Sequence, residues 1–413
     1  MPKPLKPDNF IPPRPARPAR AARPDSAPLP TEIASGFDAF AVAAPGLAPL
    51  VAAECIARGV TPRDVSPAGV SFNATAEQLF TMNLWSRLAS RVLVRLAEFE
   101  ARDFATLEKM AGRVPWHHVL WPGAAVRLRV TCRKSRLYHS DAVAERVARG
   151  ITNTIKGSQA LGRARDDEDD DDGNTQLIVV RFDHDRCTIS ADSSGALLHR
   201  RGWRQAIAKA PLRETLAAAM LVACEWNGEV PLVDPFCGSG TIGIEAALRV
   251  RGMAPGLGRE FAMELWPGAD APMHGRVRDA AKADALPSVG VPIVMRDRDA
   301  GACKAAVANA ERAGVLADLV IEQGPLSDTS LDAVGSSGLV LTNPPYGLRI
   351  SDGSDLRSLY ARLGDVVRAG GRGWRLGMLV PDRALAAQTR LTFDAAMRTT
   401  NGGLPVDVLL SRA

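Results

Sequence analysis

Cysteine and histidine are scarce in this sequence, and their scarcity excludes several classes of protein. The 413 residues include six cysteines, which have neither the density of a disulfide scaffold nor the paired spacing of a metal site. The six histidines form no HExxH motif and no cluster with cysteines and carboxylates at metal-binding spacing. We therefore predict no metal ion, and a reducing compartment suits the chain.

Long apolar runs are missing as well. No stretch approaches ~18 consecutive apolar residues, and no apolar core follows the basic start, so we predict neither a membrane span nor a secretory signal. Hydrophobic residues still make up 46% of the chain, enough for two or three domains with cores of their own. We expect a soluble, cytoplasmic protein whose net charge of +5 permits a nucleic-acid partner.

Charge is unevenly distributed along the chain. Residues 1–34 are rich in Pro, Ala and Arg and hold few large apolar side chains, which predicts a disordered tail. This tail is either an arm that attracts phosphate or a plain solubilising segment. Residues 166–172 are all acidic, and their mutual repulsion predicts an inserted loop that stays in solvent and that RNA avoids.

The region before residue 200 alternates short strand and helix patterns. In residues 35–100 we predict strands at 37–43, 70–72 and 91–99 and helices at 46–58 and 76–88. This α+β pattern is typical of a ferredoxin-like unit. A second group in residues 101–200 has predicted helices at 104–111 and 141–155 and predicted strands at 124–131, 176–182 and 186–190.

Two basic clusters contain aromatic residues, a combination that predicts phosphate contact and base stacking. The first cluster is Arg133, Lys134, Arg136 and Tyr138. The second lies at the joint between the two halves of the chain and is Arg200, Arg201 and Arg204, with Trp203 among them. Solvated arginines on the wet face of a strand or in a linker would produce similar patterns, so both interpretations stay open.

The tetrapeptide Asn343-Pro344-Pro345-Tyr346 follows an apolar run at 338–342 that predicts a buried strand. The side-chain carbonyl of Asn343 and the backbone carbonyl of the next residue can accept both N–H bonds of a planar exocyclic amine. Proline stiffens the turn, and Tyr346 offers a face on which a base can stack. These features suit methyl transfer to such an amine, and a Pro-rich turn without chemistry is the alternative.

Residues 231–247 form the pattern strand, Gly-rich turn and helix, which predicts a ligand site. Free amides in the turn and the positive end of the helix suit a carboxylate. Asp297, which ends the next predicted strand, is placed to hydrogen-bond the ribose of S-adenosylmethionine, and Asp299 is the expected N-cap of a helix at 300–313. The predicted cofactor contacts are Asp234, Phe236, Gly238, Ser239, Gly240, Thr241, Asp297 and Asn343.

The same turn also matches the dinucleotide fingerprint Gly238-x-Gly240-x-x-Gly243. That fingerprint requires an acidic residue about 20 positions further on. Here the acid comes much later, after a Gly/Pro-rich insertion at residues 252–290, so an NAD enzyme is the weaker interpretation. Cys237 in this turn is either a reactive thiol or, as we expect, a small residue that fills a tight space.

From about residue 36 onward the chain resembles the RNA methyltransferases that join a ferredoxin-like segment and a THUMP domain to a Rossmann-like class I catalytic domain. Within them it is most similar to the bacterial 23S ribosomal RNA guanine-N2 methyltransferases of the L type, the UPF0020 family. The NPPY motif alone would also admit adenine-N6 and protein-glutamine methyltransferases. The resemblance rests on residues 69–72, 83–91, 99–104, 134–139, 199–204, 210–215, 234–241 and 343–347.

The resemblance implies an α/β fold with a ferredoxin-like segment at 35–100, a THUMP domain at 101–200 and a Rossmann-like methyltransferase domain at 205–413. It implies direct transfer of a methyl group from S-adenosylmethionine to the 2-amino group of a guanine in ribosomal RNA, without a covalent nucleophile. Because the chain stops soon after predicted strands at 375–380 and 406–410, we expect one active site. We also expect residues 36–200 to bind RNA and residues 205–413 to bind cofactor on their own.

Two departures from the family pattern affect the cofactor site. Gln323 stands where relatives often have an acid that contacts adenine, and Arg296 stands where they commonly have glycine before the ribose-binding acid. Arg296 either contacts phosphate or points to solvent. Two rival functions stay open: a guanine-N2 methyltransferase acting on transfer RNA, and a non-catalytic RNA-binding or ribosome-assembly protein.

Overall fold

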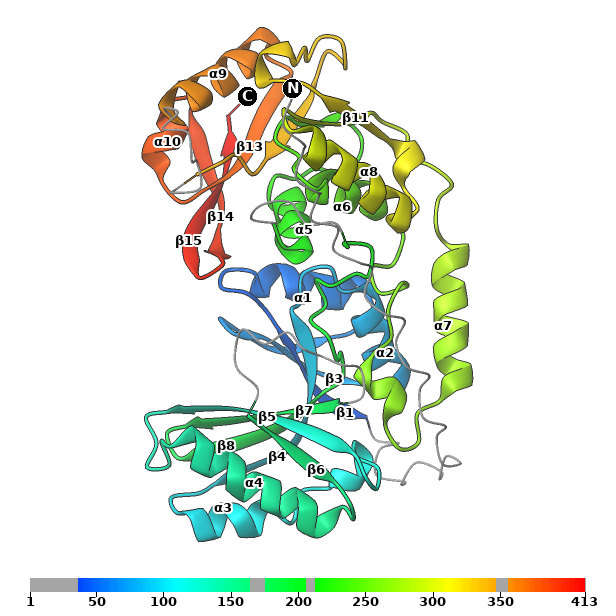
Figure 1. Ribbon diagram of the computed structural model, residues 1–413, viewed down its shortest axis with the longest axis vertical. Helices are drawn as coiled ribbons and strands as arrows, with labels where there is room; N and C mark the ends of the chain where they lie inside the picture. Colours follow the sequence, from blue (N-terminus) through cyan, green and yellow to red (C-terminus); the bar gives the residue numbers. More distant parts are fainter. Residues whose placement is uncertain (1–35, 164–174, 206–211, 347–355, 413) are drawn as a thin grey trace, which may run out of the picture.

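Two β-sheets organise the chain, one at each end of the molecule (Figure 1). The computed structural model describes residues 36–163, 175–205, 212–346 and 356–412. The predicted tail at 1–34 and the acidic run at 166–172 lie outside these ranges. Within them, none of the helices combines the length and the apolar character that crossing a bilayer requires.

The first half of the N-terminal sheet has the predicted ferredoxin-like topology. Its strands lie in the order β2-β3-β1-β4, and every neighbouring pair is antiparallel. Helix α2 begins with a reciprocal cap, because the Thr75 side chain accepts from the Gln78 amide while the Gln78 side chain accepts from the Thr75 amide. The elements are β1 Phe37–Val42, α1 Ala48–Ala57, β2 Pro62–Ser66, β3 Gly69–Ala74, α2 Ala76–Trp85 and β4 Arg91–Glu100.

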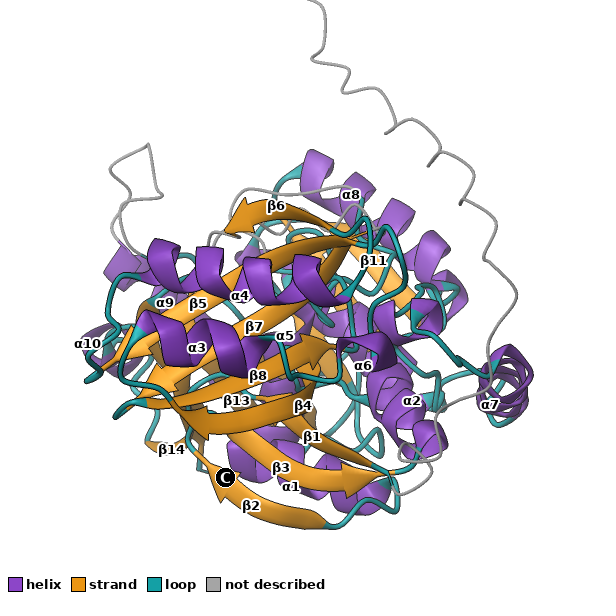
Figure 2. Cartoon of the chain, turned by 90° about the horizontal axis from the view of Figure 1, so that it is seen from below, coloured by secondary structure: helices purple, strands orange, loops and turns teal. Residues whose placement is uncertain are grey.

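The second half continues the same sheet, because β4 pairs antiparallel with β8 and the order runs on as β8-β7-β5-β6. The boundary predicted at residue 100 therefore falls inside one continuous sheet of eight strands. Helices α3 and α4 cover one face of the second half, whereas α1 and α2 lie on the opposite side, toward the C-terminal sheet (Figures 1 and 2). The elements are α3 Phe104–Ala111, β5 Ala125–Arg133, α4 Ser140–Thr154, β6 Gln159–Arg163, β7 Thr175–Asp183 and β8 Arg186–Asp192.

The C-terminal sheet has seven strands in the order β11-β10-β9-β12-β13-β15-β14. Strands β11 to β13 are parallel, and the hairpin β14–β15 adds antiparallel to β13. The strand order reverses between β9 and β12, which is where doubly wound sheets bind ligands at the carboxyl ends of their strands. Its strands are β9 Leu232–Asp234, β10 Ile293–Asp297, β11 Leu319–Gln323, β12 Gly338–Thr342, β13 Trp374–Val380, β14 Phe393–Asn401 and β15 Leu404–Ser411, and its helices are α5 Glu214–Ala223, α6 Thr241–Val250, α7 Ala271–Ala283, α8 Ala300–Ala313, α9 Leu356–Ala369 and α10 Arg383–Ala387.

The segment 252–290, predicted as a Gly/Pro-rich insertion, contains helix α7. Asp270 caps this helix by accepting from the Met273 amide at 2.9 Å. The helix packs against α2, where the His274 ring stacks on Phe80 with 4.3 Å between centroids. Strands β2, β6 and β14 are also additions to the predicted elements.

The same segment 252–290 joins the two sheets. Trp266 Nε1 donates to Gln176 Oε1 on β7 at 2.7 Å, and Arg259 donates to the carbonyls of Ser194 and Leu197 at 2.9 and 2.7 Å. Arg278 lies over the rings of Phe80 and Phe261, at 5.1 and 5.3 Å from their centroids. The N-terminal sheet therefore packs against segment 252–290, which lies between strands β9 and β10 of the C-terminal sheet.

A buried group of charges forms a second joint, which we call the interface cluster: Arg87, Arg201 and Glu245. Glu245 on α6 is fully buried and forms ion pairs with Arg87 at 3.5 Å and Arg201 at 3.3 Å. Arg87 also donates to the carbonyls of Leu248 and Met253 at 3.0 and 2.6 Å. Residues of the N-terminal half thus hold the helix that follows the Gly-rich turn.

Candidate active site

The Gly-rich turn connects β9 to α6 at the reversal point of the C-terminal sheet. Gly240 is the N-cap of α6 with φ +87°, a left-handed conformation that glycine adopts without strain, and no side chain caps the helix. The first-turn amides of α6 thus lie at the positive end of a helix without a side-chain cap. Arg204 donates to Thr241 Oγ1 at 2.8 Å and Asn309 donates to the Ser239 carbonyl at 3.0 Å, so neighbouring segments fix the turn.

Asp234 ends β9 and ties it to β12. Its Oδ1 accepts from the Thr342 hydroxyl at 2.6 Å and from the Phe236 amide at 3.1 Å, and the residue is 2% exposed. Burial raises the pKa of Asp234 from its ordinary 3.8 to about 7, the two hydrogen bonds offset part of this rise, and the nearby Asp297 carboxylate adds to it. A carboxyl group that titrates near neutral pH therefore lies beside the turn.

Asp297 ends β10 and reaches the same turn. Its Oδ2 accepts from the Gly238 amide at 2.9 Å, and its Oδ1 accepts from the Asp299 amide at 3.0 Å. Asp299 caps α8, as predicted, by accepting from the Gly301 amide at 2.7 Å. The structure therefore brings the predicted ribose-binding acid into contact with the predicted carboxylate-binding loop.

Arg296 pairs with neighbouring protein groups. Its Nη1 lies 3.1 Å from Glu322 Oε2 and donates to the Asp328 carbonyl at 3.0 Å. The guanidinium thus connects the end of β10 to β11 and to the segment after it. The prediction that Arg296 points to solvent is wrong, because its side chain is only 15% exposed, and phosphate contact stays a prediction.

The NPPY segment follows β12 directly, beside Asp234. Asn343 is half-buried, and its Oδ1 is buried with no hydrogen-bond partner among the described residues. The Pro345 carbonyl accepts a long hydrogen bond, 3.5 Å, from the hydroxyl of Tyr360. Tyr346 is only 8% exposed, and its hydroxyl oxygen accepts from Asn401 Nδ2 at 2.8 Å. An unsatisfied acceptor and an anchored aromatic ring therefore stand together at the reversal point.

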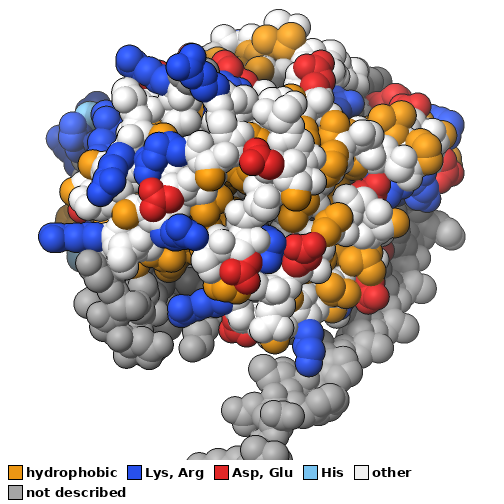
Figure 3. Space-filling model, turned by 90° about the horizontal axis from the view of Figure 1, so that it is seen from above, with side chains coloured by type: hydrophobic (Ala, Val, Ile, Leu, Met, Phe, Trp, Pro, Cys, Tyr) orange, Lys and Arg blue, Asp and Glu red, His pale blue; other side chains and the backbone are white. Residues whose placement is uncertain are grey.

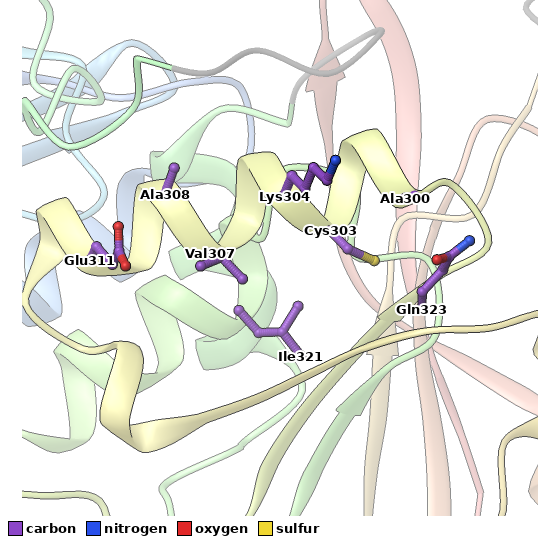
Figure 4. Close-up of a pocket in the computed structure, with 8 residues that line it drawn as sticks. All are labelled: Ala300, Cys303, Lys304, Val307, Ala308, Glu311, Ile321 and Gln323. Carbon is purple, nitrogen blue, oxygen red and sulfur yellow. The ribbon is translucent and has the colours of Figure 1, made fainter.

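A cavity of about 330 Å³ lies between α8 and β11 (Figure 4). Gln323, the residue predicted near the adenine, lies at one end of it with Ala300 and Cys303, and Glu311 lies at the other. The Cys303 thiol approaches the Asp297 carbonyl at 3.6 Å, which places this end beside the ribose-binding acid. The lining residues are Ala300, Cys303, Lys304, Val307, Ala308, Glu311, Ile321 and Gln323.

Cys237 in the Gly-rich turn is a buried side chain that fills space. Burial raises the pKa of its thiol far above the ordinary value, with the carboxylates of Asp234 and Asp297 adding to the effect. A thiol of this kind stays protonated at neutral pH and is a poor nucleophile. Within the described ranges, no three His, Cys, Asp or Glu side chains gather closely enough to hold a metal ion.

The first predicted RNA cluster lies on the surface. Four exposed residues make up this cluster, at the end of β5 and in the segment that follows it: Arg133, Lys134, Arg136 and Tyr138. Tyr138 is 68% exposed, and its ring lies 4.1 Å from that of His139. The cluster is therefore accessible, and RNA contact stays a prediction for these four residues.

The second predicted RNA cluster is corrected at two of its three members. Arg201 is 3% exposed, and besides Glu245 it donates to the carbonyls of Leu198, Ser86 and Arg87 at 2.6, 3.3 and 2.7 Å. Arg204 pairs with Glu214 at 2.9 Å and holds the Gly-rich turn through Thr241. Both guanidinium groups are therefore bound by other groups of the protein and are not available at the surface for RNA. Arg200 is exposed, and its RNA contact stays a prediction.

A group of exposed arginines that the sequence analysis did not single out follows the NPPY segment. Figure 3 shows Lys and Arg side chains gathered on its left side, the side on which α9 and α10 lie in Figure 1. The signal that could have found them is the helical period of α9, whose Tyr360, Leu363 and Val367 are buried so that its arginines must face outward. The exposed residues are Arg357, Arg362, Arg368, Arg372, Arg383 and Arg390.

Comparison with protein families shows which known proteins the chain is similar to. The family described as RMKL-like, methyltransferase domain, matches residues 201–407, half of the chain, and the RlmL ferredoxin-like domain matches residues 38–93. The ribosomal RNA large subunit methyltransferase K/L of Syntrophotalea carbinolica is 36% identical over 387 residues, 90% of this chain and 53% of that protein. The chain thus spans about half the length of the K/L relatives it matches.

Other similar proteins match over nearly their whole length. The Synechocystis sp. protein slr0064 is 32% identical over 371 residues, which cover 90% of this chain and 95% of that protein. The crystal structure of SMU.472, which holds SAH, superposes with a TM-score of 0.81 at 27% identity and covers 92% of this chain and 98% of that one. The chain belongs to the RMKL-like family of methyltransferases, and its cofactor is S-adenosylmethionine.

Proposed function

We propose that this protein transfers a methyl group from S-adenosylmethionine to the exocyclic N2 of a guanine in 23S ribosomal RNA. The observation that carries the proposal is the buried Asn343 Oδ1, which has no hydrogen-bond partner among the described residues. Leaving a buried acceptor unpaired costs about 1–3 kcal/mol, so its presence at a ligand-binding edge calls for a donor from a ligand. A planar amine with two N–H bonds is such a donor.

The residues around Asn343 have complementary tasks in this proposal. Asn343 Oδ1 and the Pro344 carbonyl accept the two N–H bonds of the amine and so direct its nitrogen lone pair. The first-turn amides of α6 hold the cofactor carboxylate, and Asp297 holds the ribose. When bound, S-adenosylmethionine supplies a methyl group that its sulfonium charge already activates. Tyr346 stacks on the guanine after the base leaves its helix, which costs a few kcal/mol.

The choice of RNA rests on two features outside the NPPY site. The exposed cluster Arg133, Lys134, Arg136 and Tyr138 offers phosphate contacts and a stacking ring, and the K/L relatives are named as methyltransferases of large-subunit ribosomal RNA. The experiment that tests the substrate is a map of N2-methylguanine in total RNA from a strain that lacks the gene. A loss in 23S ribosomal RNA supports the proposal, and a loss only in transfer RNA, or none, contradicts it.

Asp297→Ala should weaken S-adenosylmethionine binding by about 1.5–3 kcal/mol, because a charge-assisted hydrogen bond to the ribose is lost. Titration calorimetry on the purified protein measures the change, with an unaltered thermal unfolding midpoint as the control for the fold. Affinity equal to wild type would remove Asp297 from the ribose role.

Asp297→Ala also removes the contact with the Gly238 amide, and a disturbed Gly-rich turn could weaken cofactor binding without any role for the ribose. A ligand that lacks both ribose hydroxyls distinguishes loss of the ribose contact from disturbance of the turn. We expect the wild-type protein to bind 2′,3′-dideoxy S-adenosylhomocysteine more weakly than S-adenosylhomocysteine. The Asp297→Ala variant should bind the two equally, because the partner of the hydroxyls is already gone. A variant that still discriminates between them would assign the lost affinity to the turn.

Asp234 should make cofactor binding depend on pH. The pKa of Asp234 is about 7 in the folded chain and 3.8 ordinarily, so between these values the folded state holds the extra proton. The contribution of Asp234 to the free energy of unfolding therefore falls as pH rises from about 4 to about 7. Above about pH 7 the folded chain bears the full cost of a buried negative charge. The positive charge of the cofactor favours the ionised carboxylate. Binding should thus tighten as pH rises through about 7 and release at most about half a proton at that pH.

Calorimetry in two buffers with different ionisation enthalpies measures this proton release. The matched control is Asp234→Asn, which keeps an acceptor for the Thr342 hydroxyl and cannot ionise. We expect no proton release from this variant. If wild-type affinity is independent of pH across neutrality, Asp234 does not respond to the cofactor.

A further inference from the structure

The ring of Tyr346 is held from outside the NPPY segment, by a residue 55 positions later in the chain. Asn401 Nδ2 donates to the Tyr346 hydroxyl oxygen at 2.8 Å, and Asn401 is the last residue of β14. It pairs with Leu404 across a two-residue turn, so it stands at the tip of the β14–β15 hairpin. In Figure 1 this hairpin extends from the C-terminal sheet toward α1. The position of Asn401 is therefore set by the hairpin.

Each strand of this hairpin contacts another part of the protein. On the catalytic side, β15 pairs with β13 from Gly377↔Leu410 to Val380↔Asp407, and Asp407 forms an ion pair with Arg383 at 2.6 Å. On the other side, the Arg398 carbonyl of β14 lies so close to Gly46 that a Cβ there would approach it to 2.0 Å. Only glycine permits this approach, and Gly46 has φ +81° besides. The hairpin is thus in direct contact with the loop that precedes α1.

We propose that Asn401 is a positioning residue that holds Tyr346 in place for the target base, on a hairpin whose location is set jointly by the two halves of the protein. The inference rests on the proposed function, in which Tyr346 stacks on the guanine. A hydrogen bond at the hydroxyl fixes the position of the outer end of the ring and so restricts the side-chain rotamers of Tyr346. The side chain therefore loses less conformational entropy when the base binds. The link also makes the position of the ring sensitive to the N-terminal module through Gly46.

A double-mutant cycle tests the positioning role. Asn401→Ala removes the donor, and Tyr346→Phe removes the acceptor while keeping the ring. Each single variant should raise the KM for ribosomal RNA about tenfold, with a smaller change in kcat, and the double variant should also show about a tenfold rise. If the two effects multiply to about a hundredfold, or if Asn401→Ala behaves as wild type, the proposal is overturned.

The matched control is Thr400→Ala, one residue earlier on β14, whose side chain lies on the opposite face of the strand by alternation. It perturbs the same strand without removing the donor, so its KM should equal that of the wild type. An increase as large as that of Asn401→Ala would assign the effect to the hairpin fold and overturn the specific role.

A second measurement is independent of the RNA substrate. The chain has three tyrosines, Tyr138, Tyr346 and Tyr360, so protein labelled with 3-fluorotyrosine should show three fluorine resonances that Tyr→Phe variants assign. Asn401→Ala should move the Tyr346 resonance and leave that of Tyr138 in place, and an unmoved Tyr346 resonance overturns the link. If the wild-type protein methylates no ribosomal RNA, the proposed function fails and the base-positioning role fails with it, whereas the resonance still reports on the hydrogen bond.

Discussion

Asn343→Ala should lower kcat by about two orders of magnitude or more while S-adenosylmethionine affinity stays nearly normal. The substitution removes a buried acceptor that has no partner among the described residues, and it leaves the Gly-rich turn, Asp234 and Asp297 intact. A hundredfold drop corresponds to roughly 2.7 kcal/mol, comparable to the loss of one well-aligned polar contact in a catalytic site. The measurement is the transfer of labelled methyl to large-subunit ribosomal RNA from cells that lack the gene.

A fall in kcat without a loss of S-adenosylmethionine affinity would assign the effect of Asn343→Ala to the target amine and not to the cofactor site. Asn227→Ala is the matched control, because Asn227 is an exposed asparagine in the turn before β9, at the opposite end of the sheet from the NPPY segment. It should keep wild-type kcat. Full activity in Asn343→Ala, or a digest that contains a modified nucleoside other than N2-methylguanine, would contradict the proposed function.

Glu245→Ala should cost about 3–5 kcal/mol of unfolding free energy, the largest stability effect that we expect from a single substitution in this chain. Glu245 is fully buried between Arg87 and Arg201, whose side chains are 12% and 2% exposed. Its removal leaves two like charges facing each other in a region that water reaches poorly. Urea denaturation, followed by tryptophan fluorescence, measures the loss.

Two further variants define the cause of that loss. Glu245→Gln keeps a hydrogen-bond acceptor but not the charge, and it should lie between wild type and Glu245→Ala. Asp279→Ala removes an exposed ion pair to Lys282, whose side chains are 77% and 62% exposed, and it should change stability little. A Glu245→Ala variant as stable as the Asp279→Ala variant would show that the interface cluster contributes nothing net.

The interface cluster also revises the expected independence of residues 205–413. A cut at residue 205 separates Glu245 from both of its arginines. It also uncovers Phe261 and Trp266, which are 1% and 4% exposed in the whole chain and contact Phe80 and Phe37 of the N-terminal half. We therefore expect the isolated C-terminal half to fold poorly, so its failure to methylate would say little about RNA binding.

Sequence alone predicted where candidate site residues lie when their positions depend on neighbours along the chain. The turn after β9, the acid that ends β10 and the NPPY segment each lie at the carboxyl end of a strand, and parallel strands bring such ends together. The cap of α8 by Asp299 is local in the same way. The strand order places β9 next to β12, so Asp234 lies beside Thr342 once the fold is known.

Sequence was insufficient where the partner is distant or where one residue type suits two environments. The run His199 to Arg204 reads equally well as a phosphate contact or as a linker, and only the fold shows that Arg201 meets Glu245, 44 residues away. Helix α7 has a weak apolar stripe, and its partner Phe80 lies nearly two hundred positions earlier. The contact of Asn401 with Tyr346 has no sequence signature, because a polar residue next to a hairpin turn is normally predicted to face solvent.

The pairing of β4 with β8 has a consequence for synthesis of the chain. β4 ends at Glu100 and β8 begins at Arg186, 86 residues later. During translation, the β4 edge of the first half of the sheet therefore has no partner strand until β8 has been synthesised. Translation at about 5–20 residues per second makes this interval about 4–17 seconds. Throughout it Arg91 lacks Asp192, its buried ion-pair partner, and the unpaired edge of β4 can accept a strand from another nascent chain. Chaperone protection therefore matters most before residue 192 has emerged, and fragments that end near residue 100 should self-associate through β4.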